Sequence, residues 1–102
     1  MSVKIVVELA AKLDVLDSAN WYENERAGLG TEFLDDIEYV LGRIEENPEQ
    51  FPRIVGDARR AMLRRFPYSV YFRIDGAIAK VMAILHQRRD PDVARSRLGR
   101  AT

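Results

Sequence analysis

The fold is decided by residues 66–85, which read FPYSVYFRIDGAIAKVMAIL. Residues 68–74 and 77–85 are rich in β-branched, aliphatic and aromatic side chains, and Asp75-Gly76 stands between them. An Asp-Gly pair between two such runs is a strong short-range signal for a β-hairpin. The second run is almost continuously apolar, which is typical of a buried strand, so we expect it to lie in the centre of its sheet.

The hairpin is followed by the basic segment HQRRDP, residues 86–91. Its histidine and two arginines fall where the second strand should end, and side chains at a strand end reach solvent from a rigid base. Asp90-Pro91 is typical of a helix N-cap followed by proline at the first helical position, so we expect a short helix over residues 91–98. This end of the sheet is therefore the first candidate for a functional surface.

Two amphipathic helices are predicted upstream, after a short β-branched strand over residues 3–8. The first covers residues 9–26 and ends at residues 27–30, where glycine accepts the left-handed conformation of a C-cap. The second begins with Thr31 as its N-cap and stops at Asn47-Pro48. The predicted buried stripes are Leu9, Leu13 and Leu16, widened by Val15, Ala19 and Tyr22, on the first helix, and Phe33, Ile37, Val40, Leu41 and Ile44 on the second.

Residues 48–57 are predicted to form a loop with two prolines, and a strand follows near residues 59–65. In that strand Arg60 and Arg64 share one face, because side chains alternate with a period of two. The order β-αα-βββ predicts an α+β fold, with a two-helix hairpin on one face of an antiparallel sheet. At 102 residues the chain forms one domain over residues 1–102. The expected core is Leu13, Leu16, Phe33, Ile37, Leu41, Ile44, Leu63, Val70, Phe72, Val81, Ala83 and Leu85.

The composition argues against several classes of protein, namely disulfide-rich, thiolate-metal and membrane proteins. There is no cysteine, hence no disulfide framework and no thiolate metal site. No apolar run approaches the roughly 18 residues that span a bilayer, and the N-terminus lacks the pattern of a cleavable signal. The sequence has no metal-ligand cluster and no glycine-rich phosphate loop. We therefore expect no metal, no cofactor and no membrane association, and the cytoplasm is the predicted location.

The formal net charge is zero, but the charges are divided between the two halves. Residues 1–50 carry twelve acids and four bases, whereas residues 51–102 carry four acids and twelve bases, eleven of which are arginine. Arginine binds carboxylates and phosphates in a bidentate geometry that lysine cannot reproduce. Two interpretations stay open. Either the acidic helices form ion pairs with the basic sheet, or the basic half is a surface for nucleic acid or an acidic protein segment.

The order and spacing of several motifs make the sequence resemble the RelE/ParE superfamily of bacterial toxin–antitoxin modules. These motifs are WYE at 21–23, GLG at 28–30 with Phe33, NP at 47–48 with FP at 51–52, RRFPY at 64–68 and HQRRDP at 86–91. The resemblance implies a β-αα-βββ toxin of a type II (plasmid stabilisation) system, neutralised by an antitoxin encoded beside it. The superfamily holds two classes, ribosome-dependent mRNA endonucleases of RelE type and DNA gyrase inhibitors of ParE type.

The positions that match the RelE nuclease site favour the ParE class. RelE carries lysines at the positions of Arg60 and Met62, an arginine at Ser69 and a tyrosine at Ala94, and only Arg88 is identical. Cleavage of RNA at the ribose 2′-hydroxyl needs several cations and a proton-transfer group. The ending His-x-Arg-Arg, by contrast, resembles ParE. We therefore expect a ParE-like toxin without a catalytic residue, which inhibits DNA gyrase by binding it.

Two alternatives stay open. One is a RelE-type endonuclease that acts on mRNA in the ribosome, with the catalytic candidates Arg60, His86 and Arg88 and with the histidine as acid or base. The other is a degenerate member that binds antitoxin without toxicity. The side chains predicted to bind the target or the antitoxin are Arg60, Arg64, Arg73, His86, Arg88 and Arg89.

A structural role is also open for part of the basic segment. The lone histidine at a strand end often completes a hydrogen-bond network instead of taking part in catalysis. Arg88 and Arg89 could tie the terminal helix down through Asp90 or Asp92. These interpretations predict side chains with internal partners, whereas a binding surface needs side chains that are free.

The aromatic residues are interpreted chiefly as core. Trp21 and Tyr22 are expected to pack between helix and sheet, with lining of a partner groove as the alternative for Trp21. Tyr68, Tyr71 and Phe72 are expected in the core, not as a platform for stacked bases.

Overall fold

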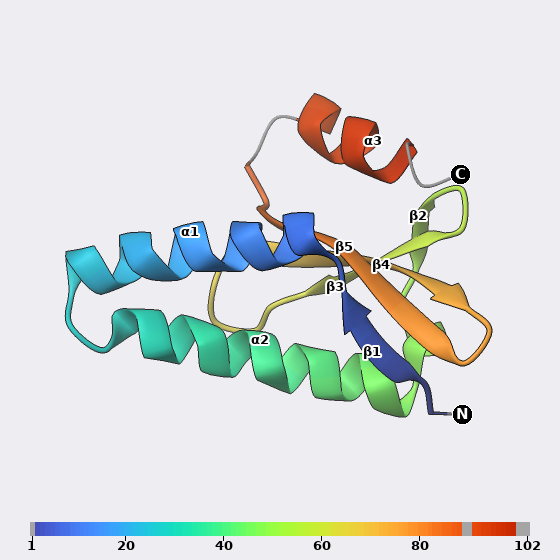
Figure 1. Ribbon diagram of the computed structural model, residues 1–102, viewed down its shortest axis with the longest axis horizontal. Helices are drawn as coiled ribbons and strands as arrows, with labels where there is room; N and C mark the ends of the chain where they lie inside the picture. Colours follow the sequence, from blue (N-terminus) through green and yellow to red (C-terminus); the bar gives the residue numbers. More distant parts are fainter. Residues whose placement is uncertain (1, 89–90, 100–102) are drawn as a thin grey trace.

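A two-helix hairpin lies against one face of a five-stranded sheet, and a third helix lies against the opposite face (Figure 1). The computed structural model describes residues 2–88 and 91–99, apart from the side chains of residues 91–93. The elements in chain order are β1 (Lys4–Val7), α1 (Leu9–Glu25), α2 (Leu29–Glu46), the 3-10 helix η1 (Pro48–Gln50), β2 (Arg53–Val55), β3 (Ala58–Met62), β4 (Tyr68–Asp75), β5 (Ile78–His86) and α3 (Pro91–Gly99).

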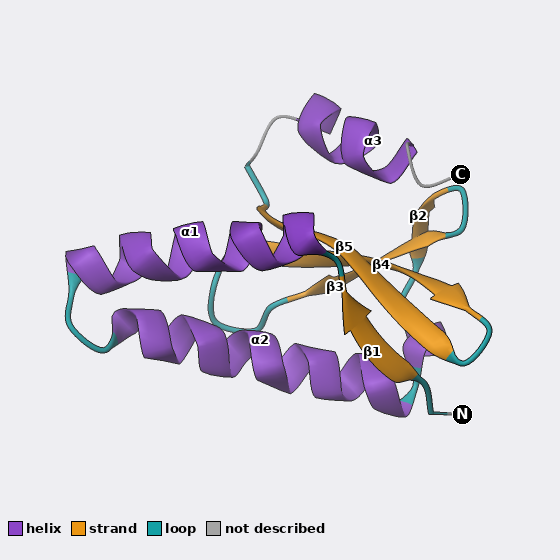
Figure 2. Ribbon diagram, in the orientation of Figure 1, coloured by secondary structure: helices purple, strands orange, loops and turns teal. Residues whose placement is uncertain are grey.

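The sheet has the strand order β1-β5-β4-β3-β2 (Figure 2). β1 runs parallel to β5, and the other neighbours are antiparallel. The α+β prediction is confirmed, and β5 is central, as its apolar sequence indicated. Two elements were not predicted, because η1 and the short strand β2 fall within the expected loop over residues 48–57. The N-cap expected at Asp90 lies outside the described residues.

The β4–β5 hairpin forms as predicted, but its two-residue loop lies one position later than Asp75-Gly76. Asp75 pairs with Ile78, so that Gly76 and Ala77 form the loop. Gly76 has a φ of 60°, a left-handed conformation that glycine adopts without a steric penalty. Glycine at the first loop position is typical of type II′ hairpins, whose twist matches that of the strands.

A β-bulge interrupts the hairpin near its middle. Tyr71 pairs with Ala83 and Phe72 pairs with Val81, which leaves Met82 as the extra residue of β5. A bulge of this kind bends a strand and increases its local twist. Val81 belongs to the core beneath α1 and α2, whereas Met82 belongs to a second cluster beneath α3.

The buried face of α2 agrees with the prediction; that of α1 agrees at Val15, Ala19 and Tyr22 but not at the three leucines. Phe33, Ile37, Val40 and Ile44 are buried and Leu41 is half-buried. On α1 the leucine stripe points to solvent, and the residues that face the core are Ala11, Val15, Ala19 and Tyr22. The relative exposures of the three leucines are 71%, 51% and 57% at Leu9, Leu13 and Leu16. The remaining predicted core residues, Leu63, Val70, Phe72, Val81, Ala83 and Leu85, are buried.

The physical reason for the orientation of α1 is its close approach to α2. A Cβ atom on Gly30 would lie 2.7 Å from the carbonyl oxygen of Ala19, so only glycine fits at this crossing. The residue of α1 at this close contact is the small Ala19, which faces the core. The leucines are therefore left on the outer face, and the prediction that Leu13 and Leu16 belong to the core is wrong.

The start of α2 also differs from the prediction, because the cap is not Thr31. The helix begins at Leu29 after Gly28, which has a φ of 90°. The Glu23 carboxylate accepts hydrogen bonds from the backbone N–H groups of Gly28 at 2.9 Å and Gly30 at 3.0 Å. A carboxylate is well placed there, since the N-terminus of a helix carries partial positive charge.

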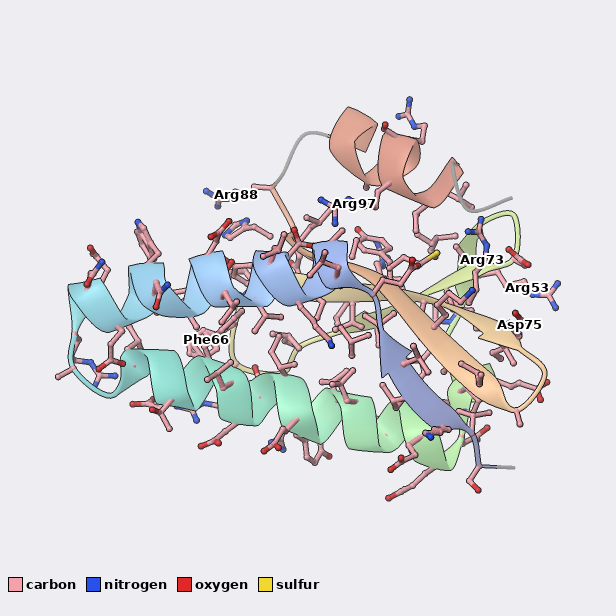
Figure 3. The ribbon with its side chains drawn as sticks, viewed as in Figure 1. Arg53, Phe66, Arg73, Asp75, Arg88 and Arg97 are labelled. Carbon is pink, nitrogen blue, oxygen red and sulfur yellow. The ribbon has the colours of Figure 1, made fainter. Side chains whose placement is uncertain are left out.

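The C-terminal helix α3 is fixed to the sheet by one apolar and one ionic contact. Leu98 is fully buried against Ala58 and Met82. The Arg97 guanidinium donates to Asp14 on α1 through Nη1 to Oδ2 at 2.8 Å and Nη2 to Oδ1 at 3.3 Å. Oδ2 of Asp14 also accepts the backbone N–H of Ile84 at 3.0 Å. Figure 3 shows Arg97 reaching from α3 toward α1.

Candidate functional site

Two hollows meet at His86, where β5 ends. We call the first the aromatic pocket; it lies on the α1 side, holds about 450 Å³ and is lined by Asp17, Ser18, Trp21, Tyr22, Tyr68 and His86. We call the second the arginine groove; it lies on the α3 side, holds about 260 Å³, and its lining includes Arg60, Tyr71, Leu85, His86, Gln87, Ala94 and Arg95. The predicted functional end of the sheet is thus hollowed on both sides, with one imidazole shared between them.

The position of His86 is set by β4 and by the backbone after the strand. His86 pairs with Tyr68 in the hairpin, and the two rings meet edge to face with centroids 5.2 Å apart. Its Nδ1 accepts the backbone N–H of Arg88 at 3.0 Å. In the neutral imidazole this hydrogen bond places the proton on Nε2, because Nδ1 is the acceptor. The histidine therefore has an internal hydrogen-bond partner on Nδ1, and its Nε2–H remains as a donor.

The structure brings Arg60 and His86 of the predicted site together in the lining of the arginine groove, and Arg88 contacts His86 through its backbone N–H. Arg60 lines the arginine groove, pairs with Tyr71 across β3 and β4, and is half-buried. Arg88 is exposed directly after β5. Within the described residues, neither guanidinium forms a hydrogen bond or an ion pair, so both are free to meet an anionic group. Arg89 lies outside the described residues.

Arg64 does not belong to this site, and the prediction that it shares a face with Arg60 is wrong. β3 ends at Met62, so Arg64 lies in the loop that follows and not in the strand. Its guanidinium carbon lies 3.4 Å from the ring centroid of Tyr39, and its Nε lies 3.9 Å from Asp36. The stacked guanidinium holds the loop against α2.

Arg73 is likewise a structural residue. Its Nε forms an ion pair with Asp57, its Nη1 donates to the Sδ of Met82 at 3.2 Å, and its side chain is only 11% exposed. The pKa of Asp57 is held below its ordinary value, chiefly by the hydrogen bond from Arg73. Figure 3 shows Arg73 and Arg53 at the opposite end of the sheet from Arg88.

The first interpretation of the divided charge, ion pairs between the acidic helices and the basic half, is confirmed in part. Among the described residues, Arg64, Arg65 and Arg97 of the second half pair with Asp36, Glu32 and Asp14 of the first, respectively. Arg26 shares Glu32 with Arg65, and their hydrogen bonds lower the pKa of that carboxyl. Arg60 and Arg88 form no such ion pair with any described residue, so their side chains remain available to a partner.

The structure places the three positions that differ from the RelE nuclease pattern. Met62 is half-exposed at the end of β3, Ser69 is buried at 1% relative exposure, and Ala94 lines the arginine groove from α3. A buried serine cannot present a charge to a phosphate, and alanine has no proton to transfer. Of these three residues Ala94 alone lines the groove, and none of the three carries the group that the nuclease pattern has at its position.

Sequence reasoning missed part of the site. Trp21 is 58% exposed and lines the aromatic pocket, so its interpretation as core is wrong and the partner-groove alternative is favoured. Tyr22 does pack inward against Phe33 and Phe66, with centroids 5.3 Å and 4.9 Å away. Burial, followed by the neighbouring Tyr68, raises the pKa of Tyr22 to about 12. Arg95 could have been found from its place one turn into the predicted helix.

The described residues include no group of three or more histidine, cysteine, aspartate or glutamate side chains arranged to hold a metal ion. Of the helices in the described part of the chain, none combines the length and the apolar character that a membrane crossing requires.

The chain is similar to toxins of known structure. Against the chromosomal ParDE toxin–antitoxin system from P. aeruginosa the TM-score is 0.75 at 19% identity, over 83% of this chain and 96% of that one. Against the RelBE toxin–antitoxin complex from Mycobacterium tuberculosis it is 0.58 at 14% identity, over 84% and 99%. Against a mutant of the E. coli toxin RelE in the free state it is 0.64 at 13% identity, with complete coverage of both chains. At these identities the likeness establishes the fold.

The family assignment comes from the sequence itself. No curated protein matches the chain. The family described as "ParE toxin of type II toxin-antitoxin system, parDE" matches residues 5–91. That range holds the helix hairpin, nearly the whole sheet and the histidine between the two hollows. The chain therefore belongs to the ParE toxin family of type II toxin–antitoxin systems.

Proposed function

We propose that this protein arrests growth by binding DNA gyrase and that a cognate antitoxin neutralises it. The observation that carries the proposal is the arginine groove, in which Ala94 stands where a nuclease needs a tyrosine. Ser69 and Met62 likewise replace the cations of the nuclease site. Removing one preorganised charge donor typically lowers the rate of an enzyme by about 10²–10³, and this chain departs from the nuclease pattern at three positions. Binding without bond chemistry needs only the free arginines.

Arg60 and Arg88 are the side chains that we assign to the target contact. Both are accessible, and neither has an ionic partner among the described residues. Arginines that are already free need not break an internal ion pair before they bind an anionic surface. Long-range attraction between such a surface and the target raises the association rate more than the final affinity.

The antitoxin should be an acidic, amphipathic segment that lies across the helix hairpin and the sheet edge. Structures of ParDE and RelBE systems are similar to this fold, which supports such a partner. The exposed leucines of α1 supply apolar anchors, and buried apolar anchors carry most of the affinity at protein interfaces. The acids of the antitoxin would meet Arg60 and Arg88 and thereby fix its orientation.

A RelE-type endonuclease is the second candidate, and one observation favours it. His86 presents Nε2–H at the edge of the groove that holds Arg60 and Arg95. A proton donor beside two guanidinium groups is a minimal arrangement for cleavage of a phosphodiester. In this candidate, His86 would be the acid and the arginines would stabilise the charge of the phosphate.

Two assays on the purified chain separate the candidates. In gyrase supercoiling we expect inhibition, and in ribosome-programmed mRNA cleavage we expect none. In cells, DNA replication should stall with an SOS response while translation is intact at early times. Cleavage at codons with undisturbed supercoiling would contradict the gyrase proposal and establish the nuclease.

Matched variants test the groove. The double variant Arg60→Ala/Arg88→Ala should abolish growth arrest and leave the melting temperature unchanged, because neither guanidinium bonds to any residue that the structure describes. Arg53→Ala is the control, since Arg53 is also exposed but lies at the other end of the sheet (Figure 3). Equal toxicity of the double variant and the control would remove Arg60 and Arg88 from the target contact.

The antitoxin is tested by co-expression with the neighbouring reading frame. We expect the two proteins to purify as a complex and growth arrest to be relieved. A chain that neither arrests growth nor inhibits gyrase but still forms this complex would be the degenerate member considered above.

A further inference from the structure

We infer that the aromatic pocket is a binding site for a cationic side chain, an arginine or lysine of a protein partner that docks along α1. The inference goes beyond the proposed function, because it depends on neither the target nor the chemistry of the arginine groove. It rests on the rings that form the walls, on an unpaired carboxylate at the rim, and on the charge of the helix beside it.

The walls of the pocket are a continuous series of aromatic rings. The ring centroids of Trp21 and Tyr22 lie 5.1 Å apart, those of Tyr22 and Tyr68 lie 6.1 Å apart, and those of Tyr68 and His86 lie 5.2 Å apart. A cation is attracted to the face of an aromatic ring, and tryptophan gives the strongest attraction. Trp21 is 58% exposed, so its indole can meet a ligand. A hollow of about 450 Å³ is large enough for a guanidinium group and its stem.

The carboxylate at the rim is Asp17, which stands one turn before Trp21 on α1. Residues four apart on a helix are neighbours on its surface, so the carboxylate lies beside the indole. Ser18 and Tyr22 are also four residues apart, so they are neighbours on the helix surface and line the same pocket. Asp17 forms no hydrogen bond or ion pair with any described residue, so its charge is available. A carboxylate next to aromatic faces offers a guanidinium both a charge-assisted hydrogen bond and a cation–π contact.

The charge of α1 distinguishes a cation from a nucleic acid, which would also stack on aromatic rings. Over Leu9–Glu25 the helix carries four acids and one base, Lys12. Asp14 is paired with Arg97 and Glu23 caps α2, so Asp17 and Glu25 are the acids without a partner among the described residues. A phosphate backbone along this face would be repelled, whereas a basic side chain is attracted. Of the two arginines assigned above to an anionic partner, Arg60 lies in the groove on the other side of the sheet, and neither lines the aromatic pocket. The protein itself already uses the same chemistry where Arg64 stacks on Tyr39.

The test is a titration of the purified chain followed by NMR. The indole N–H signal is unambiguous, because the chain has a single tryptophan. The probe is N-acetyl-arginine amide, whose guanidinium is its only charge, and its neutral counterpart is N-acetyl-citrulline amide. We expect saturable shifts at Trp21, Ser18 and His86 with a dissociation constant on the order of millimolar, as befits a ligand of this size. The citrulline compound should bind at least about tenfold more weakly.

Two variants and one control complete the experiment. Asp17→Asn should weaken arginine binding about tenfold while the spectrum stays folded, and Trp21→Leu, read at Ser18 and His86, should abolish it. Asp35→Asn removes an exposed acid from α2 and should change nothing. Equal binding of the arginine and citrulline compounds, or an unchanged affinity in Asp17→Asn, would overturn the inference. Saturation by adenosine monophosphate but not by the arginine compound would also overturn it, and would make the pocket a nucleotide site.

Discussion

Asp36 on α2 and Phe66 in the β3–β4 loop are joined by a hydrogen bond from the backbone N–H of Phe66 to Oδ2, at 3.1 Å, in the interior of the protein. The same carboxylate accepts the N–H groups of Arg65 at 2.8 Å and Arg64 at 3.4 Å. One side chain, at 2% relative exposure, thus holds three consecutive residues of the loop. This loop leads directly into β4 at Tyr68, which forms a wall of the aromatic pocket.

Replacing Asp36 by alanine should cost about 3 kcal/mol of the free energy of unfolding, because buried backbone donors lose a charged acceptor. Urea denaturation followed by circular dichroism measures this loss. Asp35→Ala is the matched control, since Asp35 is the exposed neighbour on the same helix, and it should change stability by less than about 0.5 kcal/mol. Similar losses in the two variants would mean that the carboxylate of Asp36 is not the anchor of the loop.

Alanine substitutions should reduce stability more on the buried face of α2 than at the leucines of α1. Phe33→Ala or Ile37→Ala should destabilise the protein by about 2–5 kcal/mol, the range for large buried side chains. Leu13→Ala should cost less than about 0.5 kcal/mol in the isolated chain, because Leu13 is half-exposed. Thermal unfolding of the three variants under the same conditions gives the comparison. A large loss at Leu13 with a small one at Phe33 would contradict the assigned faces.

Breaking the ion pair between Asp14 and Arg97 should release α3 without unfolding the rest. In Arg97→Ala, and in Asp14→Asn, backbone amides of residues 94–99 should exchange with solvent faster, because local opening costs less than global unfolding. The asparagine keeps an oxygen for the N–H of Ile84, so protection of β5 should be retained in Asp14→Asn. Loss of protection in β5 and α3 together would show that the two elements open as one unit.

Tyr22 should make stability sensitive to alkaline pH. Its pKa is raised from 10.0 to about 12 in the folded protein, so the neutral phenol is favoured by folding. This contribution is fully present below the unfolded pKa of 10.0 and is lost as pH rises through the folded value of about 12. Ultraviolet absorbance should show a phenol that ionises late, and Tyr22→Phe should remove that step and flatten the alkaline loss of stability. An unchanged titration in Tyr22→Phe would assign the late phenol to another tyrosine.

Elements with strong local signals were predicted correctly from the sequence. The buried stripe of α2 and the hairpin follow from side-chain periodicity and a turn glycine, which act within a few residues. The face of α1 was not predictable in this way, because both of its sides carry apolar residues. What decides between them is the close crossing at Gly30, a contact between segments that periodicity does not describe.

For the candidate site, the sequence predicted the location but not which side chains are available. The end of β5 could be located, since a strand that stops before a proline exposes the side chains that follow. Whether an arginine is free depends instead on distant acids, because Arg64 is paired with Asp36 and Arg73 with Asp57. The exposure of Trp21 likewise depends on how α1 is rotated about its own axis. The residues next to Trp21 in the sequence do not determine that rotation.

The extra residue in β5 changes how positions along this strand should be compared between relatives. On an uninterrupted strand, counting from the turn would place Ala79, Val81, Ala83 and Leu85 on the side of α1, and His86 on the opposite side. The extra residue Met82 reverses the alternation of faces beyond the bulge. The face of His86 therefore follows from its pairing with Tyr68 and not from its distance to the turn. In a relative whose strand lacks this bulge, a histidine one position nearer to the turn would occupy the same place between the two hollows.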